Sequence, residues 1–286
     1  MYSRGLLETL LFPPVYLNTK KLEERLHGKT ILITGASFGI GEALAYRLAD
    51  IDCHLILVAR TEEKLLQVKQ EVEKKKAKAT IFPADLRDTG KVEELTSFIN
   101  QLPDGLDLFV SNAGISIKRS IADSLDRFHD FTRTMALNYF APVQLLLSII
   151  PLLEKNKGHI INVSTVNALL IPFPYWAAYQ ASKSAFDTWF RSASLELNAM
   201  GIATSSVYLP LVRTRMILPT KEYQHAPAMS PEYVAEIICR LICTRRRKYK
   251  PWWLIFAQFA SITFRGIWES VIPASIKKGK KDNGNG

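Results

Sequence analysis

The feature that most constrains the fold is a short apolar segment that runs directly into a glycine-rich turn. Residues 30–34 read Thr-Ile-Leu-Ile-Thr, glycines follow at positions 35, 39 and 41, and an apolar-periodic segment continues over 42–49. This order is typical of a buried strand, a tight turn and a helix whose N-terminus approaches a phosphate. The spacing Gly35-x3-Gly39-x-Gly41 differs from the common G-x-G-x-x-G, and a glycine-rich turn alone also occurs as a purely structural element.

The same alternation continues along the chain. Helix-periodic segments separate further short apolar segments, which lie at 54–59, 79–83, 106–110, 158–165 and 202–208. Strands that alternate with helices in this way form right-handed βαβ crossovers and a parallel sheet that is covered on both faces. We therefore predict an α/β fold, a doubly wound Rossmann-type sandwich with a mostly parallel seven-stranded sheet, in a single domain.

Two flanking segments do not follow this alternation of strands and helices. The predicted Rossmann-fold domain covers residues 29–244, between an N-terminal arm at 1–28 and a C-terminal extension at 245–286. An apolar patch at 6–17 of the arm is too short to span a bilayer. Because one basic residue precedes the patch and no small-residue cleavage pattern follows it, the arm does not have the form of a signal peptide. The arm either packs on the domain or contacts a lipid surface.

The basic charge of the chain is concentrated in the extension. The chain has 37 basic and 27 acidic residues, a net charge of +10, and ten of the basic but two of the acidic residues lie at 245–286. The nearly neutral remainder argues against a nucleic-acid-binding fold, whereas the extension is suited to anionic lipid. Tryptophans and basic flanks at 252–264 suit a membrane interface, and the alternative is a last strand with a substrate lid. We expect disorder at 277–286.

Cysteine and histidine are sparse. Three cysteines, at 53, 239 and 243, and five scattered histidines predict neither a disulfide framework nor a metal site. We therefore expect a reducing, cytoplasmic setting, with the option of a peripheral contact with a membrane.

Tyr179 and Lys183 are the strongest candidates for chemistry. They are four residues apart at the start of a helix-periodic segment, so both side chains lie on one helix face. An ammonium beside a phenol favours the phenolate, which lowers a pKa that is normally about 10. The pair can then exchange the proton of a carbonyl–alcohol couple. Taken alone, this spacing more often marks an exposed pair on a helix.

Several further motifs in a fixed order favour a functional role for Tyr179 and Lys183 over an exposed pair on a helix. The sequence resembles short-chain dehydrogenases/reductases of the classical, single-domain kind over about 29–244, on the motifs Thr34-Gly35-Ala36-Ser37-Phe38-Gly39-Ile40-Gly41, Asp85, Asn112-Ala113-Gly114, Asn138, Tyr179 and Lys183. The resemblance implies hydride transfer between a nicotinamide cofactor and a carbonyl carbon, with Tyr179 as the proton donor. It also implies that Lys183 lowers the tyrosine pKa and holds the ribose, and that Asn138 positions a relay water.

The hydroxyl that orients the substrate carbonyl is ambiguous. The family places a serine at the end of the fifth strand, and the usual spacing to Tyr179 falls on Thr165 rather than Ser164. Threonine keeps the hydroxyl donor but adds a methyl group and stiffens χ1. Both residues stay candidates at this point, and a damaged site is the third option.

The cofactor expected from the resemblance is NADP(H). Arg60 follows the second strand, where a site selective for NAD has an acid that holds the ribose hydroxyl, and an Arg accommodates the additional phosphate of NADP. In the family's segment after the sixth strand, Leu211 replaces a glycine, which leaves the register of Val212 and Thr214 open. The candidate cofactor-binding residues are Gly35, Ser37, Phe38, Gly39, Ile40, Gly41, Arg60, Asp85, Leu86, Asn112, Ala113, Gly114, Tyr179, Lys183, Pro210, Val212 and Thr214.

The substrate expected is hydrophobic. Residues 211–221 and 230–233 are similar to the reductase domain of bacterial fatty acyl-CoA reductases, which implies reduction of a long-chain acyl thioester or aldehyde. The apolar stretch 167–176 is either a substrate wall, core packing or a dimer contact. The alternatives are a 3-oxoacyl, sphingoid or hydroxysteroid-type ketone reductase and, in another class, a dinucleotide-binding scaffold or sensor with little activity. The resemblance also implies a homodimer or homotetramer that assembles through helices within 123–156 and 184–200.

Overall fold

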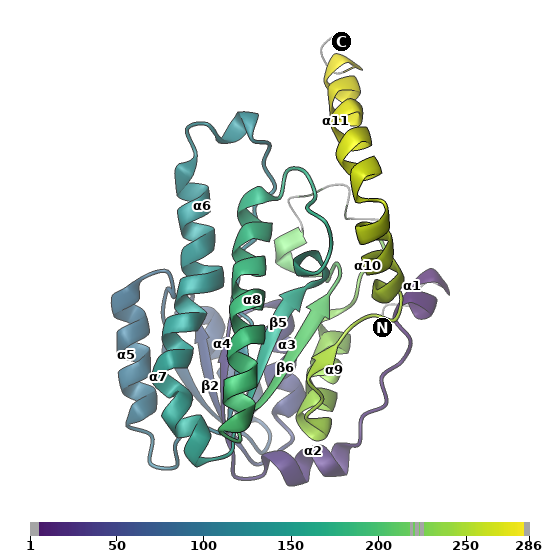
Figure 1. The fold of residues 1–286 in the computed structure, drawn as a ribbon. Coiled ribbons are helices and arrows are strands. Elements are labelled where there is room, and N and C mark those ends of the chain that lie inside the picture. Colours follow the sequence, from purple (N-terminus) through teal and green to yellow (C-terminus); the bar gives the residue numbers. More distant parts are fainter. Residues whose placement is uncertain (1–5, 218–219, 221–222, 224–225, 283–286) are drawn as a thin grey trace.

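A seven-stranded sheet lies between two layers of helices (Figure 1). The computed structural model describes residues 6–217, 220, 223 and 226–282. The strand order is β3-β2-β1-β4-β5-β6-β7. Within the described residues every pairing between named strands is parallel, so the expectation of a mostly parallel sheet is met by one that is parallel throughout.

The elements follow one another in the predicted alternation. The bounds of the six strands predicted with ranges differ from the expected ones by at most two residues, whereas α3 begins three residues before the expected 42 and α8 seven residues before the expected 184. The strands are β1 Thr30–Thr34, β2 His54–Ala59, β3 Lys78–Pro83, β4 Leu108–Ser111, β5 His159–Thr165, β6 Ala203–Leu209 and β7 Lys248–Tyr249. The α-helices are α1 Leu6–Leu11, α2 Thr19–Leu26, α3 Gly39–Leu48, α4 Glu62–Glu73, α5 Thr89–Asn100, α6 Phe128–Met135, α7 Ala141–Lys155, α8 Ala177–Ala199, α9 Pro231–Thr244, α10 Leu254–Thr263 and α11 Arg265–Asp282. Short 3-10 or π segments are η1 Ala122–Ser124, η2 Ala136–Phe140, η3 Val166–Ala168 and η4 Arg215–Ile217.

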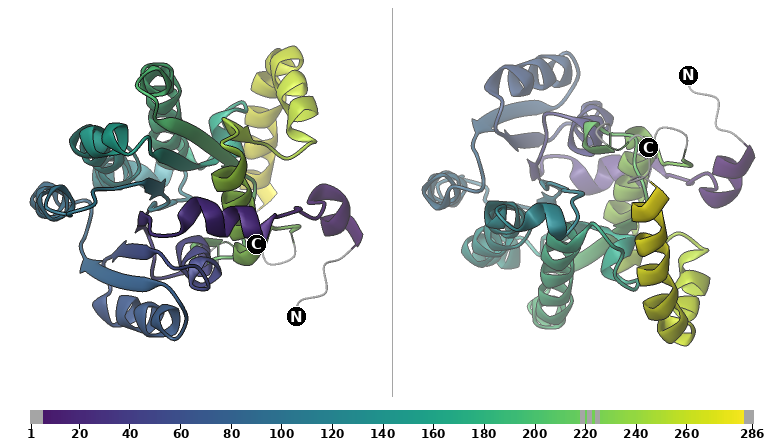
Figure 2. Two further views of the ribbon diagram at one scale, coloured as in Figure 1. Left: turned by 90° about the horizontal axis from the view of Figure 1, so that it is seen from below. Right: turned by 90° about the horizontal axis from the view of Figure 1, so that it is seen from above.

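Each face of the sheet has its own hydrophobic core. Alternate residues of β1 belong to different cores, since Ile31 and Ile33 pack with α3, α4 and α9, whereas Leu32 packs with α5, α7 and α8. All three side chains are fully buried, and burial of one such side chain contributes about 2 kcal/mol. Figure 2 shows the helices on the two sides of the sheet. This two-sided burial explains why the central strands read as continuous apolar runs rather than alternating ones.

The strand order reverses between β1 and β4. From β1 the chain proceeds outward to β2 and β3, and it then crosses back to place β4 on the other side of β1. In doubly wound sheets this reversal opens a crevice at the carboxyl ends of the two strands, where ligands bind. The loops that follow β1 and β4 are the two glycine-containing motifs of the sequence.

The N-terminal arm packs on the domain, and part of its surface stays exposed. Phe12, Leu22 and Leu26 are buried in the core that contains α3 and α9. The hydroxyl of Tyr233 on α9 donates a hydrogen bond of 2.6 Å to the carbonyl oxygen of Pro13. The arm is therefore fixed along most of its described length.

The C-terminal extension contributes the last strand and two helices. β7 pairs with β6 through Lys248 and Tyr249, and α10 and α11 follow it past the carboxyl ends of β5 and β6 (Figure 1). The structure differs from the expectation of disorder at 277–286, because α11 continues to Asp282; residues 283–286 lie outside the described part. A helix that has already nucleated gains one hydrogen bond for each further residue, which favours this continuation.

One helical stretch, Phe128–Lys155, is long and apolar enough to cross a membrane by length and composition. It consists of α6, η2 and α7, and Leu145, Leu146 and Ile149 of α7 are buried in the core beside the sheet. These apolar residues therefore serve the packing of the fold.

We predict that Gly41→Ala destabilises the protein by about 2 kcal/mol because it overpacks the turn. A Cβ atom at position 41 would lie 2.3 Å from the carbonyl oxygen of Gly35 and 2.9 Å from the Cα of Ala36, both backbone atoms. Urea unfolding monitored by circular dichroism measures the change.

The matched control is Gly266→Ala in α11, where a Cβ atom meets nothing within 4 Å. This variant is expected to be neutral, or more stable by up to about 1 kcal/mol, because alanine is the better helix former. Equal stability of the Gly41→Ala variant and the wild type would contradict the proposed crowding.

Candidate active site

The predicted residues surround one cleft at the carboxyl ends of the strands. The cleft has a volume of about 760 Å³ and extends from the turn after β1 to the N-terminal end of α8. Its lining includes Gly35, Ser37, Phe38, Ile40, Arg60, Asp85, Leu86, Asn112, Ala113, Gly114, Ser164, Thr165, Tyr179, Lys183, Pro210, Val212 and Thr214. Gly39, Gly41 and Asn138 lie behind this surface, where they support the turn and the helix next to it.

The glycine-rich turn is bonded directly to the loop after β4. Thr34 Oγ1 accepts hydrogen bonds from the backbone N–H groups of Asn112 and Ala113, both at 3.1 Å. In return Asn112 Nδ2 donates to the carbonyl oxygens of Thr34 at 3.0 Å and Gly35 at 3.2 Å. The amide donors of Asn112 are used in holding the two loops together, so this residue shapes the crevice. Asn112 also lines the cleft, and its contact with the cofactor stays a prediction.

Glycines are required where the turn closes. Gly35 and Gly39 have φ values of +67° and +62°, the left-handed region that glycine enters without strain. A Cβ atom on Gly39 would lie 2.8 Å from Cγ2 of Thr214. The segment after β6 therefore packs against the turn, and it brings Thr214 to the cleft despite the leucine at position 211.

Basic side chains flank the outer end of the cleft. Arg60 is exposed at the end of β2 and lines the cleft. Asp85 follows β3 and is held by Arg87, whose Nε lies 3.0 Å from both carboxylate oxygens. The hydrogen bond from Arg87 holds the pKa of Asp85 below its ordinary value. This end of the cleft combines an exposed guanidinium with an ionised carboxylate.

The structure distinguishes the two hydroxyls at the end of β5. Successive residues of a strand point to opposite faces, and the hydroxyl of Thr165 shares a hydrogen bond with the phenol of Tyr179. Ser164 instead donates a hydrogen bond of 3.4 Å to the buried carboxylate of Asp187 on α8. Thr165 is therefore the hydroxyl that lies beside Tyr179.

Lys183 is buried beneath Tyr179. Its ammonium donates to the carbonyl oxygen of Val163 at 3.3 Å, and a Cβ atom on Gly114 would lie 3.3 Å from the same Nζ. Burial lowers the pKa of Lys183 to about 8, and the carboxylate of Asp187, one helical turn further along α8, acts in the opposite direction.

The expected effect of Lys183 on Tyr179 is not found. Burial raises the pKa of Tyr179 above its ordinary value, and the hydrogen bond with Thr165 opposes this shift. The prediction of a lowered phenol pKa was wrong because it considered charge alone. Desolvation disfavours the charged form of each group, so it raises the pKa of a phenol and lowers that of an ammonium.

Asn138 lies in the π-helical segment η2, between α6 and α7. Its Oδ1 accepts from the N–H of Ile115 at 2.9 Å, and its Nδ2 donates to Ile115 O and to Ser182 Oγ, both at 2.9 Å. These contacts link the loop after β4 to α8. Both N–H donors of the Asn138 side-chain amide are therefore engaged within the protein. A water beside Asn138 would have to form its hydrogen bond with the backbone of η2, where the π-helical turn interrupts the regular α-helical hydrogen bonds.

Aromatic side chains line the inner wall of the cleft. Trp176 stacks on Tyr223 with ring centroids 6.0 Å apart and an interplanar angle of 12°, and it meets Tyr179 edge to face at 6.0 Å. Met216 and Ile217 extend this apolar lining. The sequence indicated the apolar stretch that ends at Trp176 but missed Tyr223, which carries no motif and reaches the wall from a distant loop.

Arg215 was also missed by sequence reasoning. Its guanidinium carbon lies 3.7 Å from the centroid of the Phe38 ring, a cation–π geometry. Both side chains line the cleft, so the segment after β6 and the glycine-rich turn make contact across it. Nothing in the spacing of residues 211–221 indicates this contact.

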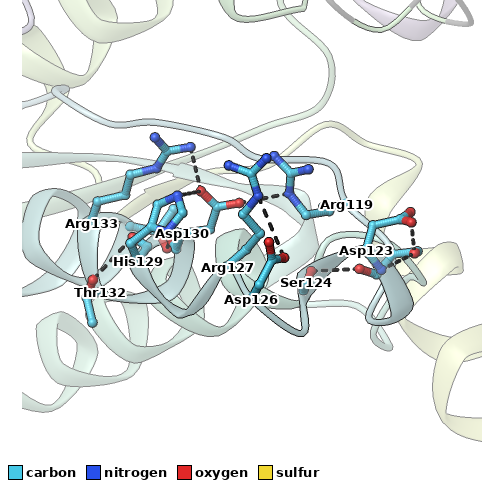
Figure 3. A network of polar contacts seen from close by, with 11 residues as sticks. Arg119, Asp123, Ser124, Asp126, Arg127, His129, Asp130, Thr132 and Arg133 are labelled. Atoms are coloured by element: carbon cyan, nitrogen blue, oxygen red, sulfur yellow. Dashed lines mark hydrogen bonds and ion pairs between the residues drawn. The ribbon is translucent and has the colours of Figure 1, made fainter.

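A charged network supports the loop that leads from the cleft to α6 (Figure 3). The buried carboxylate of Asp130 lies 2.8 Å from Arg119 Nε and 2.6 Å from Arg133 Nη2. The backbone N–H of Arg119 donates a 2.7 Å hydrogen bond to the carbonyl oxygen of Tyr175. The network thus fixes the loop after β4 against the stretch that precedes Tyr179.

The fold and the cleft together define a class of protein. A doubly wound parallel sheet, a glycine-rich turn at its switch point and a Tyr-Lys pair beside a strand-end hydroxyl are the architecture of a dinucleotide-binding oxidoreductase. Residues 29–224 match the family model for short chain dehydrogenases. The chain belongs to this family.

Curated relatives share the sequence over most of its length. A fatty acyl-CoA reductase of Acinetobacter baylyi is 43% identical over 250 residues, which cover 86% of this chain and 83% of the relative. A fatty acyl-CoA reductase of Mycobacterium tuberculosis is 37% identical over 227 residues, covering 79% of this chain and 77% of the relative.

Solved structures share the fold. A metagenomic short-chain oxidoreductase in complex with NADP is 27% identical with a TM-score of 0.66, covering 77% of this chain and 92% of that one. L-sorbose reductase from Gluconobacter frateurii, complexed with NADPH and L-sorbose, is 25% identical with a TM-score of 0.70, covering 77% of this chain and 91% of that one.

We predict that Lys183 makes stability rise with pH in the alkaline range. Its pKa in the folded protein is about 8, against 10.5 for the free side chain, so the unfolded state binds more protons between these values. The cost of burying the charge is fully present below pH 8 and is relieved as pH rises through the window. The free energy of unfolding of the wild type, relative to that of Lys183→Met, should therefore increase by about 3 kcal/mol between pH 8 and pH 10.5.

Urea unfolding of both proteins at a series of pH values measures this difference. Other titrating groups are common to both proteins and cancel. A stability difference that stays constant from pH 8 to 10.5 would show that the folded protein does not depress the pKa of Lys183.

Proposed function

We propose that this protein is an NADPH-dependent reductase of a carbonyl group on a long apolar substrate, an acyl thioester or aldehyde. The observation that carries the proposal is the contact of the Tyr179 phenol with the hydroxyl of Thr165 at the end of an apolar, aromatic-lined cleft. A phenol and a second hydroxyl on one side of a cleft offer two hydrogen bonds to a single carbonyl oxygen.

The residues of the cleft fit a dinucleotide phosphate cofactor. Gly41 has no room for a Cβ atom against Gly35 O, so the turn leaves its backbone close to the N-terminus of α3, which attracts a phosphate. The exposed guanidinium of Arg60 suits the additional phosphate of NADP. Asp85 and the loop at 112–114 would hold the remainder, and Lys183 the ribose. NADPH bound there supplies a hydride.

Tyr179 is the proton donor in this proposal. Its raised pKa keeps the phenol protonated at neutral pH, which is the state needed to donate to a carbonyl oxygen that gains negative charge. Thr165 orients the same oxygen. Lys183, with a pKa of about 8, is poised to return a proton to the phenol, and the backbone of the π segment around Asn138 is the expected position of a relay water.

The substrate class is supported by the wall of the cleft and by the relatives. Trp176, Tyr223, Met216 and Ile217 form an apolar surface next to Tyr179, which favours a chain of methylene groups over a polar sugar. Two relatives named fatty acyl-CoA reductases align over more than three quarters of this chain. Their printed names describe those proteins, and an acyl thioester is the substrate that we test first.

Two further parts of the proposal concern assembly and setting. Leu147 on α7 and Leu195 on α8 are exposed, which supports a homodimer or homotetramer that uses these helices. Cys53, Cys239 and Cys243 are free and buried, as expected in a reducing cytoplasm.

Tyr179→Phe is predicted to lower turnover by about a hundredfold or more, because a positioned general acid contributes at least that factor. Binding of NADPH, measured by fluorescence titration, should be unchanged. Turnover is measured as oxidation of NADPH and of NADH with long-chain acyl-CoA, fatty aldehyde, 3-oxoacyl and steroid ketone substrates in mild detergent.

The substrate panel separates the alternatives. Turnover with NADPH on acyl-CoA or aldehyde that is lost in the variant supports the proposal, and turnover only on a ketone indicates the ketone reductase. Cofactor binding without turnover on any substrate would favour the scaffold. Undiminished turnover of the Tyr179→Phe variant would overturn the assignment of the proton donor.

The two hydroxyls at the end of β5 are predicted to differ in effect. Thr165→Val keeps the shape of the side chain and removes the hydroxyl, and it should lower turnover by about a hundredfold, as loss of one oxyanion donor does. Thr165→Ser should retain most activity. Ser164→Ala should retain turnover and lose about 1 kcal/mol of stability, since it removes a buried hydrogen bond to Asp187. The reverse order of the two losses in turnover would assign the role to Ser164.

A further inference from the structure

Exposed apolar side chains gather at the two ends of the chain. Leu7 and Leu10 on α1 are more than half exposed, and so are the larger residues along α10: Ile255, Phe256, Phe259 and Ile262. Three of the latter, at 255, 259 and 262, are spaced so that they form one stripe along the helix. Isolated exposed apolar residues are ordinary, but a contiguous group of this kind marks an interaction surface.

Direct contacts hold the two ends together. Trp252 Nε1 donates a 3.0 Å hydrogen bond to the carbonyl oxygen of Leu10, and Figure 1 shows α1 beside the base of α10. Glu8, which is buried, pairs with Arg213 and accepts from the N–H of Ala228 at 3.2 Å. Segments more than 200 residues apart are thus joined. We call their exposed apolar side chains together the terminal face: Leu7, Leu10, Trp252, Ile255, Phe256, Phe259 and Ile262.

The buried side of α10 packs behind the wall of the cleft. Leu254 is fully buried in a cluster with Val166 and Tyr208, which lie at the ends of β5 and β6. Trp268 of α11 meets Phe173, in the stretch that precedes Tyr179, edge to face at 5.4 Å. Val166 also lines the cleft, so α10 lies next to the cleft wall.

Charge selects the partner of this face. Basic residues bracket the apolar stripe, since Lys250, which donates to Gln258 of α10, precedes it and Arg265 follows it, whereas α10 itself has no ionisable residue. An apolar stripe with a tryptophan, flanked by basic residues, is the pattern of a segment that lies in the interface of an anionic bilayer. Two copies of this chain joined through the same face would bring their basic segments together, which is unfavourable.

We propose that α1 and α10 together form a docking face for an anionic lipid surface, and that docking places the mouth of the cleft at that surface. The apolar side chains insert between headgroups while Lys250 and Arg265 contact lipid phosphates. Docking does not depend on the proposed reductase activity, and it gives a water-insoluble substrate a direct path to the cleft.

Sedimentation of the full-length protein with vesicles tests the proposal. We expect binding to vesicles of phosphatidylcholine with phosphatidylglycerol, weaker binding to phosphatidylcholine alone, and a loss of binding as salt is raised. The variants Phe259→Glu with Ile262→Glu on α10, and Leu7→Glu with Leu10→Glu on α1, should each weaken binding by tenfold or more, on the order expected when apolar side chains cannot insert.

The matched control is Leu66→Glu, the same kind of change at an exposed position of α4, which should bind vesicles as the wild type does. Circular dichroism melting confirms that each variant is folded. The proposal is overturned if the wild type does not sediment with anionic vesicles, or if the α10 and α1 variants bind as tightly as the control. It is also overturned if the wild type self-associates in solution and the same variants abolish that association, which would assign the face to a second copy of the chain.

Discussion

The active site depends on the hydrogen bonds that join the loops after β1 and β4. Thr34 accepts from two backbone N–H groups of the second loop, and Asn112 donates back to two carbonyl oxygens of the first. These bonds tie the loops together where the strand order reverses, so the crevice between them is held at a fixed width. A Cβ atom at position 41 would overlap with backbone atoms of the first loop, because this loop packs directly against the start of α3.

Burial sets the protonation of Tyr179 and Lys183 more than their mutual charge does. Tyr179 and Lys183 share one face of α8, and desolvation moves their pKa values in opposite directions, toward the neutral form of each. Asp187 continues the same helical stripe, partly restores the lysine charge, and binds Ser164. The helix thus supplies a phenol, an ammonium and a carboxylate at regular spacing. The packing of α8 against the edge of the sheet determines the solvent exposure of each group.

The two chain ends are integrated with the cleft rather than appended to it. Glu8 of the arm bonds to Arg213 and Ala228, on either side of the loop that carries Tyr223, and α10 packs behind the end of β5. A lipid surface and an apolar substrate would be met by the same small region of the protein.

The sequence alone determined the sheet, the glycine-rich turn and the Tyr179–Lys183 pair, because strand and helix periods and the i,i+4 rule are local properties of the chain. It left Thr165 and Ser164 unresolved and gave the wrong direction for the pKa of Tyr179. Both depend on which face of a strand meets α8 and on how much water remains there. The tertiary structure alone brought Tyr223 to the cleft wall and joined α1 to α10, since contacts between segments distant in sequence are decided by packing and leave no local pattern.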